Sequence, residues 1–265
     1  MNARNEGPAN QRSILNSDPP VSIMLLGASN LSRGYHCLTR CLKSNLEPRP
    51  VSFRSALGPG RGYCSDGGFL NVTYPPIKSC QFLSELQDDA EGSQKVALIT
   101  DLGNDIMYGI DPDWLIVEIK NIHRKLLAGN ADMLITPIPS TLVQQLTPFV
   151  FKILKRIFYH RSKVKRLEAI SSIERINAFI EEGVGERVTV IRGLENFTGW
   201  DRIHYDFFRL TQVWTKIAEE MLKTLDVPMK KKIKNTDTVR SYLSHLNRMM
   251  FSDISGLIKK GPEFF

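Results

Sequence analysis

The stretch VSIMLLGASN, residues 21–30, joins a short run of mainly apolar residues to a glycine turn and the beginning of a helix. Six uncharged residues without polar alternation are typical of a strand that is buried on both faces of a sheet. After the turn, apolar residues recur at helical spacing over 31–46, and Glu47-Pro48 ends that pattern. A buried strand followed directly by a helix predicts the first unit of an α/β fold.

The same alternation of apolar runs and helical patterns continues as far as Leu225. We expect further strands at 51–56, 96–100, 133–136 and 188–191, and further helices at 75–86, 114–127, 167–180 and 207–225. Apolar strands separated by helices predict a three-layer α/β/α sandwich around a mainly five-stranded parallel sheet. We expect this domain to span 21–226, between a flexible N-terminal tail at 1–20 and a basic helical extension at 227–265.

The composition excludes two classes of protein. The chain has 265 residues, of which 42% are hydrophobic and 24% are charged, as in ordinary globular domains. A disordered chain would contain fewer apolar residues than this. No run of about 18 uncharged apolar residues occurs, so a membrane-spanning helix is not expected.

The four cysteines, Cys37, Cys41, Cys64 and Cys80, indicate a reducing environment. A chain of this length does not need disulfide bonds to fold, and no nearby histidine completes a set of zinc ligands. The first 20 residues do not resemble a secretory leader. We therefore expect reduced thiols, no bound metal and a cytoplasmic location.

The net charge of +7 comes from two segments of the chain. Residues 151–166 contain seven basic and no acidic side chains, and residues 228–265 contain eight basic and three acidic ones. The rest of the chain is mildly acidic, which does not fit a positively charged groove, so we expect no nucleic-acid partner. The segments 146–166 and 228–265 are candidates for peripheral contact with a membrane or another protein.

The first of these segments contains an inserted, basic amphipathic helix at about 145–166. Its apolar stripe comprises Leu146, Phe149, Val150, Ile153, Leu154, Ile157 and Phe158. The stripe could lie on an anionic membrane surface, or it could pack on the domain as a cap over the cleft. We favour the cap, in which Phe149, Ile153 and Ile157 would line a substrate pocket for an apolar acyl group.

Candidate functional residues follow four of the predicted strands, at the edge where ligands bind in such folds. The first strand is followed by Ser29, the second by a loop containing Gly58 and Gly60, the third by Asn104, and the fifth by Asp201 and His204. Each residue also has an ordinary structural explanation. Serine is a common helix N-cap, glycine and asparagine form turns, and a lone histidine is more often a surface residue.

Together these residue types supply the parts of acyl-transfer chemistry. Ser29 would be the nucleophile, His204 the general base, and Asp201 the carboxylate that orients the imidazole. Amides of the glycine-rich loop and the side chain of Asn104 would stabilise an oxyanion. No cofactor is needed for this chemistry.

The order of these residues resembles that of the SGNH hydrolases, also called GDSL esterases and lipases, over about 21–225. In that family, four blocks of sequence carry Ser, Gly, Asn and His. Residues 27–29 resemble the first block and 103–105 the third, while 201–204 match an Asp-x-x-His motif. In the second block Gly60 is the better match and Gly58 is the alternative.

The resemblance implies a three-layer α/β/α fold and a serine esterase that cleaves a carboxylic ester of a small molecule or lipid. It assigns the catalytic triad to Ser29, His204 and Asp201. It assigns the oxyanion hole to Ser29, Gly60 and Asn104. Transfer of the acyl or acetyl group to an acceptor other than water is equally compatible with this machinery.

Three positions depart from the family pattern, one of which is Asn30, a less usual residue after the serine. Ala28 replaces the aspartate of the usual Gly-Asp-Ser, and Leu102 replaces the first glycine of the third block. One alternative function is therefore an inactive member of the fold that binds partners through its basic helices.

A second alternative is an NAD(P) oxidoreductase similar to short-chain dehydrogenases. Tyr159 and Lys163 form a Tyr-x-x-x-Lys pattern, and Ser140 lies upstream. However, the next glycine after Gly27 is Gly34, so the close glycine spacing of a dinucleotide-binding loop is missing.

Overall fold

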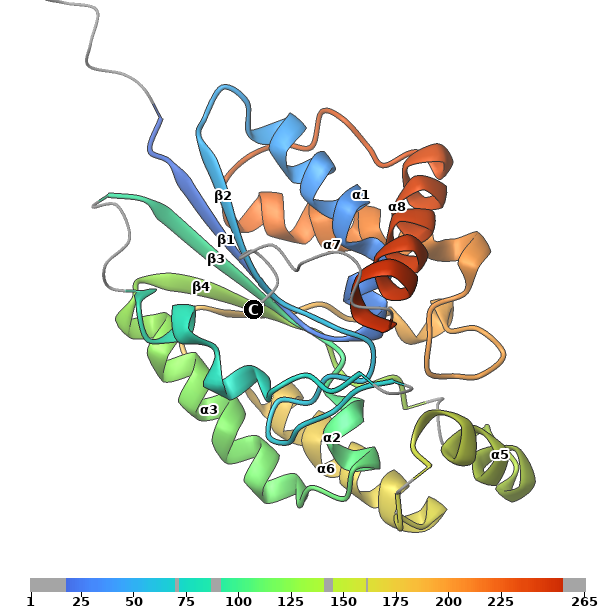
Figure 1. The fold of residues 1–265 in the computed structure, drawn as a ribbon. Helices are drawn as coiled ribbons and strands as arrows, with labels where there is room; N and C mark the ends of the chain where they lie inside the picture. The colour runs from blue at the N-terminus through green and yellow to red at the C-terminus, as the bar shows by residue number, and fades with distance from the viewer. Residues whose placement is uncertain (1–17, 70–71, 87–91, 141–144, 161, 255–265) are drawn as a thin grey trace, which may run out of the picture.

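The computed structural model describes residues 18–69, 72–86, 92–140, 145–160 and 162–254. Its centre is a parallel sheet in the order β2-β1-β3-β4-β5 (Figure 1). The strands are β1 Val21–Leu26, β2 Val51–Ala56, β3 Gln94–Ile99, β4 Ala131–Ile135 and β5 Val188–Val190. The predicted strands are confirmed, with ends that shift by at most two residues. Most of the predicted N-terminal tail, and residues 255–265 of the C-terminal extension, lie outside the described residues.

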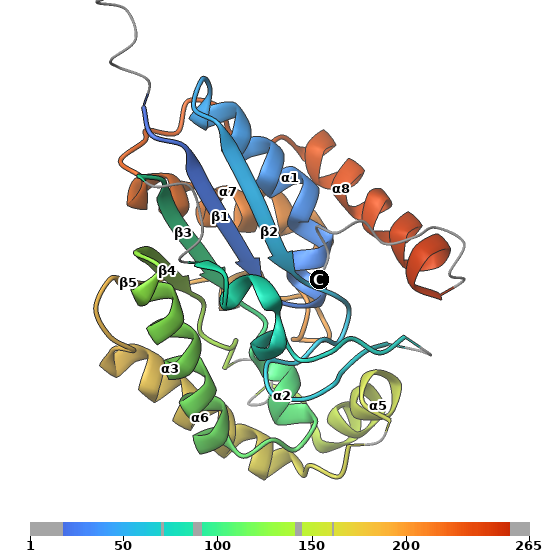
Figure 2. The same cartoon turned by 60° about the vertical axis from the view of Figure 1, so that its left-hand side comes forward.

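Helices cover both faces of the sheet, which confirms the predicted three-layer sandwich. One face carries α1 Ser29–Leu46 and α7 Leu210–Thr224, and the other carries α3 Pro112–Ala128 and α6 Arg166–Glu182 (Figures 1 and 2). Successive side chains of β1 point to opposite faces. Ile23 and Leu25 therefore pack with α1 and α7, whereas Met24 and Leu26 pack in the core under α3 and α6.

The strand order creates a switch point between β1 and β3, where the chain begins to extend the sheet in the opposite direction. Ligands of open α/β sheets bind outside the carboxyl ends of the strands at such a point. The observed order 2-1-3-4-5 differs from the order 3-2-1-4-5-6 of dinucleotide-binding folds. The sheet therefore does not favour the dehydrogenase alternative.

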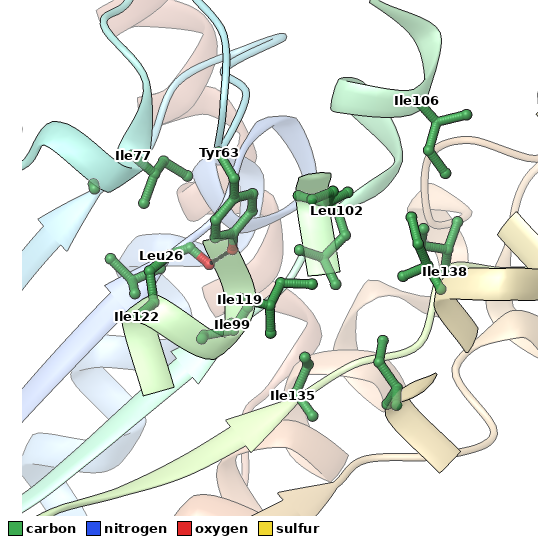
Figure 3. Packing of buried hydrophobic residues seen from close by; sticks show 14 of the residues in the cluster. Leu26, Tyr63, Ile77, Ile99, Leu102, Ile106, Ile119, Ile122, Ile135 and Ile138 are labelled. Atoms are coloured by element: carbon green, nitrogen blue, oxygen red, sulfur yellow. Dashed lines mark hydrogen bonds between the residues drawn. The ribbon is translucent and has the colours of Figure 1, made fainter. Parts of the chain in front are cut away.

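Tyr63 ties together the ends of β1 and β3 at this switch point. Its ring is fully buried, and its hydroxyl lies 2.8 Å from the carbonyl oxygen of Leu26 (Figure 3). The Thr100 carbonyl oxygen lies at the same distance from this hydroxyl, 2.8 Å. The hydroxyl oxygen accepts a hydrogen bond from the Thr100 amide at 3.2 Å. These contacts fix the backbone at the points where the loops that follow β1 and β3 begin.

The prediction of an α-helix at 75–86 is wrong. This segment forms two short 3₁₀ helices, η1 Ile77–Ser79 and η2 Gln81–Leu83. The buried residues are Ile77, Cys80, Leu83 and Leu86, which recur every third residue. That spacing matches the three residues per turn of a 3₁₀ helix, so the apolar pattern alone did not identify an α-helix.

Of the remaining helices, two lie near the edge of the sheet where the strands end, and the C-terminal one packs along α1 (Figures 1 and 2). The sequence did not predict the short helix α2 Gly103–Met107, which follows β3. The inserted segment contains α5 Pro148–Phe158, and the C-terminal extension contains α8 Asn235–Arg248, followed by the π-helical η6 Met249–Ile254. None of the described helices combines the length and hydropathy that a bilayer-spanning helix requires.

Candidate active site

Ser29 is the first residue of α1, directly after the turn that leaves β1. The residue at the N-cap position is Ala28, which has no side chain to cap the helix. A distant carboxylate takes that role: Asp101 Oδ2 accepts hydrogen bonds from the amides of Ala28, at 2.7 Å, and Leu31, at 3.1 Å. The expectation that Ser29 could be the cap is wrong, and its hydroxyl is directed to another partner.

That partner is His204. The Nε2 atom of His204 lies 3.0 Å from Ser29 Oγ, and its Nδ1 atom lies 2.7 Å from Asp201 Oδ2. Asp201 and His204 are each 8% exposed, so both are shielded from solvent. The structure thus brings together all three residues that were predicted to form the triad, although 175 positions separate Ser29 from His204 in the chain.

Both oxygens of the Asp201 carboxylate are used. While Oδ2 contacts the imidazole, Oδ1 accepts hydrogen bonds from the amides of Ile203, at 3.0 Å, and His204, at 2.9 Å. Burial alone would raise the pKa of Asp201. The hydrogen bond and charge of His204, together with the two amides, outweigh burial and hold that pKa below its ordinary value. Asp201 is therefore an anion at neutral pH.

Asn30 fixes the loop that carries His204. Its Oδ1 atom accepts a hydrogen bond from the Tyr205 amide at 3.0 Å, and its Nδ2 atom donates to the Ile203 carbonyl at 3.2 Å. Nδ2 also donates to Asp101 Oδ1 at 2.9 Å. The residue next to Ser29 thus holds both neighbours of His204. Nothing in the sequence indicated this role of Asn30, because the role depends on contacts with a remote segment of the chain.

Gly60, and not Gly58, lies in the cavity at Ser29. A cavity of about 240 Å³ is lined by Ser29, His204, Gly60 and Asn104 among others. Gly60 has a φ of +73°, a conformation that residues with a side chain rarely adopt. A Cβ atom on Gly58 would lie 2.8 Å from the ring of Tyr74, which explains that glycine by packing.

The side chain of Asn104 is fixed at both ends. Its Nδ2 atom donates to the Arg61 carbonyl at 3.0 Å, and its Oδ1 atom accepts a hydrogen bond from the Tyr159 hydroxyl at 2.5 Å. An amide nitrogen has a second hydrogen to donate. Burial raises the pKa of Tyr159 well above its ordinary value, so the phenol remains a donor. Tyr159 pairs with Asn104, a role that the sequence did not predict.

The three residues expected to line an acyl pocket do not line the cavities at Ser29. Phe149, Ile153 and Ile157 are 72%, 42% and 54% exposed. The buried side chains of α5 are Phe151 and Leu154, and Phe158 lines the cavity. Phe151 was outside the predicted stripe, but α5 is apolar over most of its surface, so helical spacing did not identify the buried side.

Ser29 also lines a second, smaller cavity of about 40 Å³. Asn104 and Tyr159 line both cavities, whereas His204 lines only the larger one. The smaller cavity has apolar walls from Leu102, Ile106, Met107, Ile138 and Ile173. Over the described ranges, no group of three or more His, Cys, Asp or Glu side chains is arranged to hold a metal ion.

The sequence matches no family model and no curated protein sequence. Similar solved structures include the esterase EstA from Pseudoalteromonas sp., with 16% identity, 77% of this chain and 98% of that chain covered, and a TM-score of 0.44. A putative arylesterase from Agrobacterium tumefaciens has 12% identity, with 77% and 99% covered and a TM-score of 0.46. A GDSL-like lipase from Bacteroides thetaiotaomicron has 12% identity, with 75% and 87% covered and a TM-score of 0.40.

These three structures bear the names of esterases and a lipase, the class of enzyme that the sequence blocks resemble. Their identities and scores are too low to carry an argument about the reaction of this chain.

Proposed function

We propose that this protein is a serine hydrolase of the SGNH type that cleaves carboxylic esters. The observation that carries the proposal is the continuous hydrogen-bonded chain from Ser29 through His204 to Asp201, at the carboxyl edge of the sheet. An N-cap serine or a surface histidine would not require this arrangement. Nucleophile, base and orienting carboxylate within hydrogen-bond distance are the geometric signature of nucleophilic acyl transfer.

In the proposed reaction His204 accepts the proton of the Ser29 hydroxyl as Oγ attacks the ester carbonyl. Asp201 holds the imidazole by Nδ1 and stabilises the imidazolium that forms. His204 then returns the proton to the leaving alcohol. Water, activated by the same histidine, releases the acyl group from Ser29. An alternative acceptor in place of water would make the enzyme an acyltransferase.

The proposed oxyanion hole consists of the amides of Ser29 and Gly60 and the side chain of Asn104. The first amides of an α-helix have no carbonyl partner within the helix. Asp101 accepts from the amides of Ala28 and Leu31, which lie on either side of the amides of Ser29 and Asn30. Loss of one oxyanion donor typically costs about 2.7–4 kcal/mol of barrier.

The test is hydrolysis of p-nitrophenyl acetate and longer esters by wild type, Ser29→Ala and the matched control Ser32→Ala. Ser32 lies on the same helix and donates to the Ala28 carbonyl at 2.7 Å, away from His204. We expect Ser29→Ala to lower kcat by at least about a thousandfold, and Ser32→Ala to retain most of the activity. A fluorophosphonate probe should label only the proteins that contain Ser29. Equal activity of Ser29→Ala and wild type would overturn the triad assignment.

The same assay separates the proposed function from an inactive binding protein, which would neither hydrolyse the esters nor react with the probe. All four cysteines are free thiols. The cytoplasmic location remains a prediction, which microscopy of a fluorescent fusion would test.

A further inference from the structure

The cavity at Ser29 contains a cationic side chain that the proposed reaction does not use. Arg33 lies four residues after Ser29 on α1, so both side chains are on the same face of the helix. Arg33, Ser29 and His204 line the same cavity of about 240 Å³. An arginine remains protonated under all ordinary conditions, so this cavity contains a permanent positive charge.

Arg33 has no ion-pair partner within the part of the chain that the structure describes. Its Nε atom is buried and forms no hydrogen bond there, and its Cζ atom lies 5.8 Å from the centre of the Tyr242 ring. Burial lowers the pKa of the guanidinium, while Tyr242, Asp201 and Asp101 act in the opposite direction. A partly buried charge is costly when no anion pairs with it, so the arrangement points to an anion supplied by a ligand.

The residues around Arg33 suit an organic anion. The helix α8 adds His245, whose Nδ1 atom is buried without a partner in the described ranges, and Tyr242. Phe69 and Phe158 supply aromatic walls. The cavity therefore combines a guanidinium, an uncharged polar ring and apolar surfaces, which together can hold an apolar group that bears a carboxylate or phosphate.

The position of His204 indicates which portion of an ester would lie beside Arg33. In the proposed mechanism His204 must protonate the oxygen of the leaving alcohol. His204 lines the cavity that contains Arg33 and does not line the cavity of about 40 Å³. This assigns the alcohol portion to the cavity that contains Arg33, and the acyl group to the cavity of about 40 Å³.

We infer that Arg33 binds an anionic group on the alcohol portion of the substrate, so the enzyme prefers esters of alcohols that carry a carboxylate or a phosphate. This inference rests on the proposed esterase function. It assigns Arg33 as the residue that determines specificity. Oxygen anions of both kinds would accept the same paired hydrogen bonds from the guanidinium.

The kinetic test compares three acetate esters: 3-acetoxybenzoate, its neutral analogue 3-acetoxybenzamide, and 3-acetoxyphenyl phosphate. Wild type should have a higher kcat/KM for the anionic esters, and the preferred anion distinguishes carboxylate from phosphate. Arg33→Gln should lose about tenfold to a hundredfold of that preference while it still cleaves the amide-bearing ester, since hydrogen bonds to charged groups are strong. Arg33→Lys should retain part of the preference. Arg40→Gln, an exposed arginine on the same helix, is the control.

The second test does not depend on catalysis. Calorimetric titration with 3-hydroxybenzoate and 3-hydroxybenzamide should show that Arg33→Gln weakens binding of the anion at least about tenfold and leaves binding of the amide unchanged. Equal losses for both compounds would assign Arg33 a structural role and overturn the inference, as would the absence of any anion preference in wild type. If Ser29-dependent hydrolysis of neutral esters persists in that case, the proposed function stands without this inference.

Discussion

Asn30 shows how closely the proposed nucleophile and the proposed base are linked at the level of single residues. One side chain, adjacent to Ser29, bonds to the residues before and after His204. The distance between Ser29 Oγ and His204 Nε2 is therefore set by the start of α1, and not only by the loop. A positional error of about 1 Å in such a site can cost a hundredfold in rate.

Of the site residues, the sequence could predict those whose chemistry follows directly from their place after a strand. Ser29, Asn104, Asp201 and His204 do meet in the structure. Asn30, Arg33, Asp101 and Tyr159 could not be assigned in advance, because their roles depend on partners in remote segments. Polar residues without catalytic chemistry of their own gave no signal that distinguishes them from caps or surface residues.

A buried histidine makes the stability of the protein depend on pH. Burial lowers the pKa of His245 from 6.5 to about 3, helped by the charge of Arg248 and Arg33. The unfolded chain takes up this proton as the pH falls through about 6.5, but the folded protein does not until about pH 3. The contribution to stability is therefore complete above pH 6.5 and declines as the pH falls from 6.5 to 3.

We accordingly expect His245→Gln to reduce the acid sensitivity of the protein. The free energy of unfolding should be measured by chemical denaturation at pH 7 and at pH 4. The decrease between these two pH values should be smaller in the variant than in wild type, by on the order of a few kcal/mol. His160→Gln, at an exposed position, provides the control. A variant whose free energy of unfolding falls with pH as steeply as that of wild type would contradict this prediction.

At the scale of elements, α5 contributes to the site through the residue at its end. Tyr159 is the C-cap of α5, and its hydroxyl bonds to Asn104 Oδ1. The inserted helix thus stabilises the orientation of the proposed oxyanion donor. The prediction of a cap over the cleft named the wrong side chains, since Phe158 and Tyr159 line the cavity instead of Phe149, Ile153 and Ile157.

We expect Tyr159→Phe to lower kcat about tenfold with little change in KM, because one hydrogen bond that orients Asn104 is lost. In an Asn104→Ala background the same substitution should have almost no further effect. Steady-state kinetics of the two single variants and the double variant check this. Independent, additive effects of the two substitutions would show that Tyr159 acts through something other than Asn104.

The segment 75–86 illustrates a different limit of sequence reasoning about elements. The central strands β1, β3 and β4 are buried over almost their whole length, so their continuous apolar runs left little ambiguity. The edge strands β2 and β5 are only partly buried and were predicted as well. An apolar period of three lies close to the 3.6 of an α-helix, and a short segment does not distinguish them. The proposed assignment to an α-helix failed there for that reason.

At the scale of the whole molecule, the structure shows which surface the basic residues of α5 share with exposed apolar side chains. The exposed side of α5 carries Phe149, Ile153 and Ile157, which were expected to be buried. Lys152 and Arg156 are also exposed on this helix. Exposed apolar residues beside basic ones favour the other expectation, peripheral contact with an anionic membrane surface.

We therefore expect the protein to sediment with vesicles that contain phosphatidylglycerol, and not with vesicles of phosphatidylcholine alone. The double variant Phe149→Ser/Ile153→Ser should weaken binding at least about fivefold, because two apolar side chains no longer enter the interface. Phe208→Ser, at an 89% exposed site in another element, is the control. Binding that is equal in the variant and wild type would exclude α5 as the contact surface.

Because Asp101 caps α1, the proposed site at Ser29 is complete only after the later segments of the chain have folded. The proposed nucleophile begins a helix whose N-cap residue, Ala28, donates its amide hydrogen bond to a carboxylate 73 residues away in the chain, after the strand that pairs with β1. While the chain is still emerging during synthesis, Ser29 has neither this cap nor His204. Under the proposed mechanism, a nascent or misassembled molecule therefore lacks an activated serine.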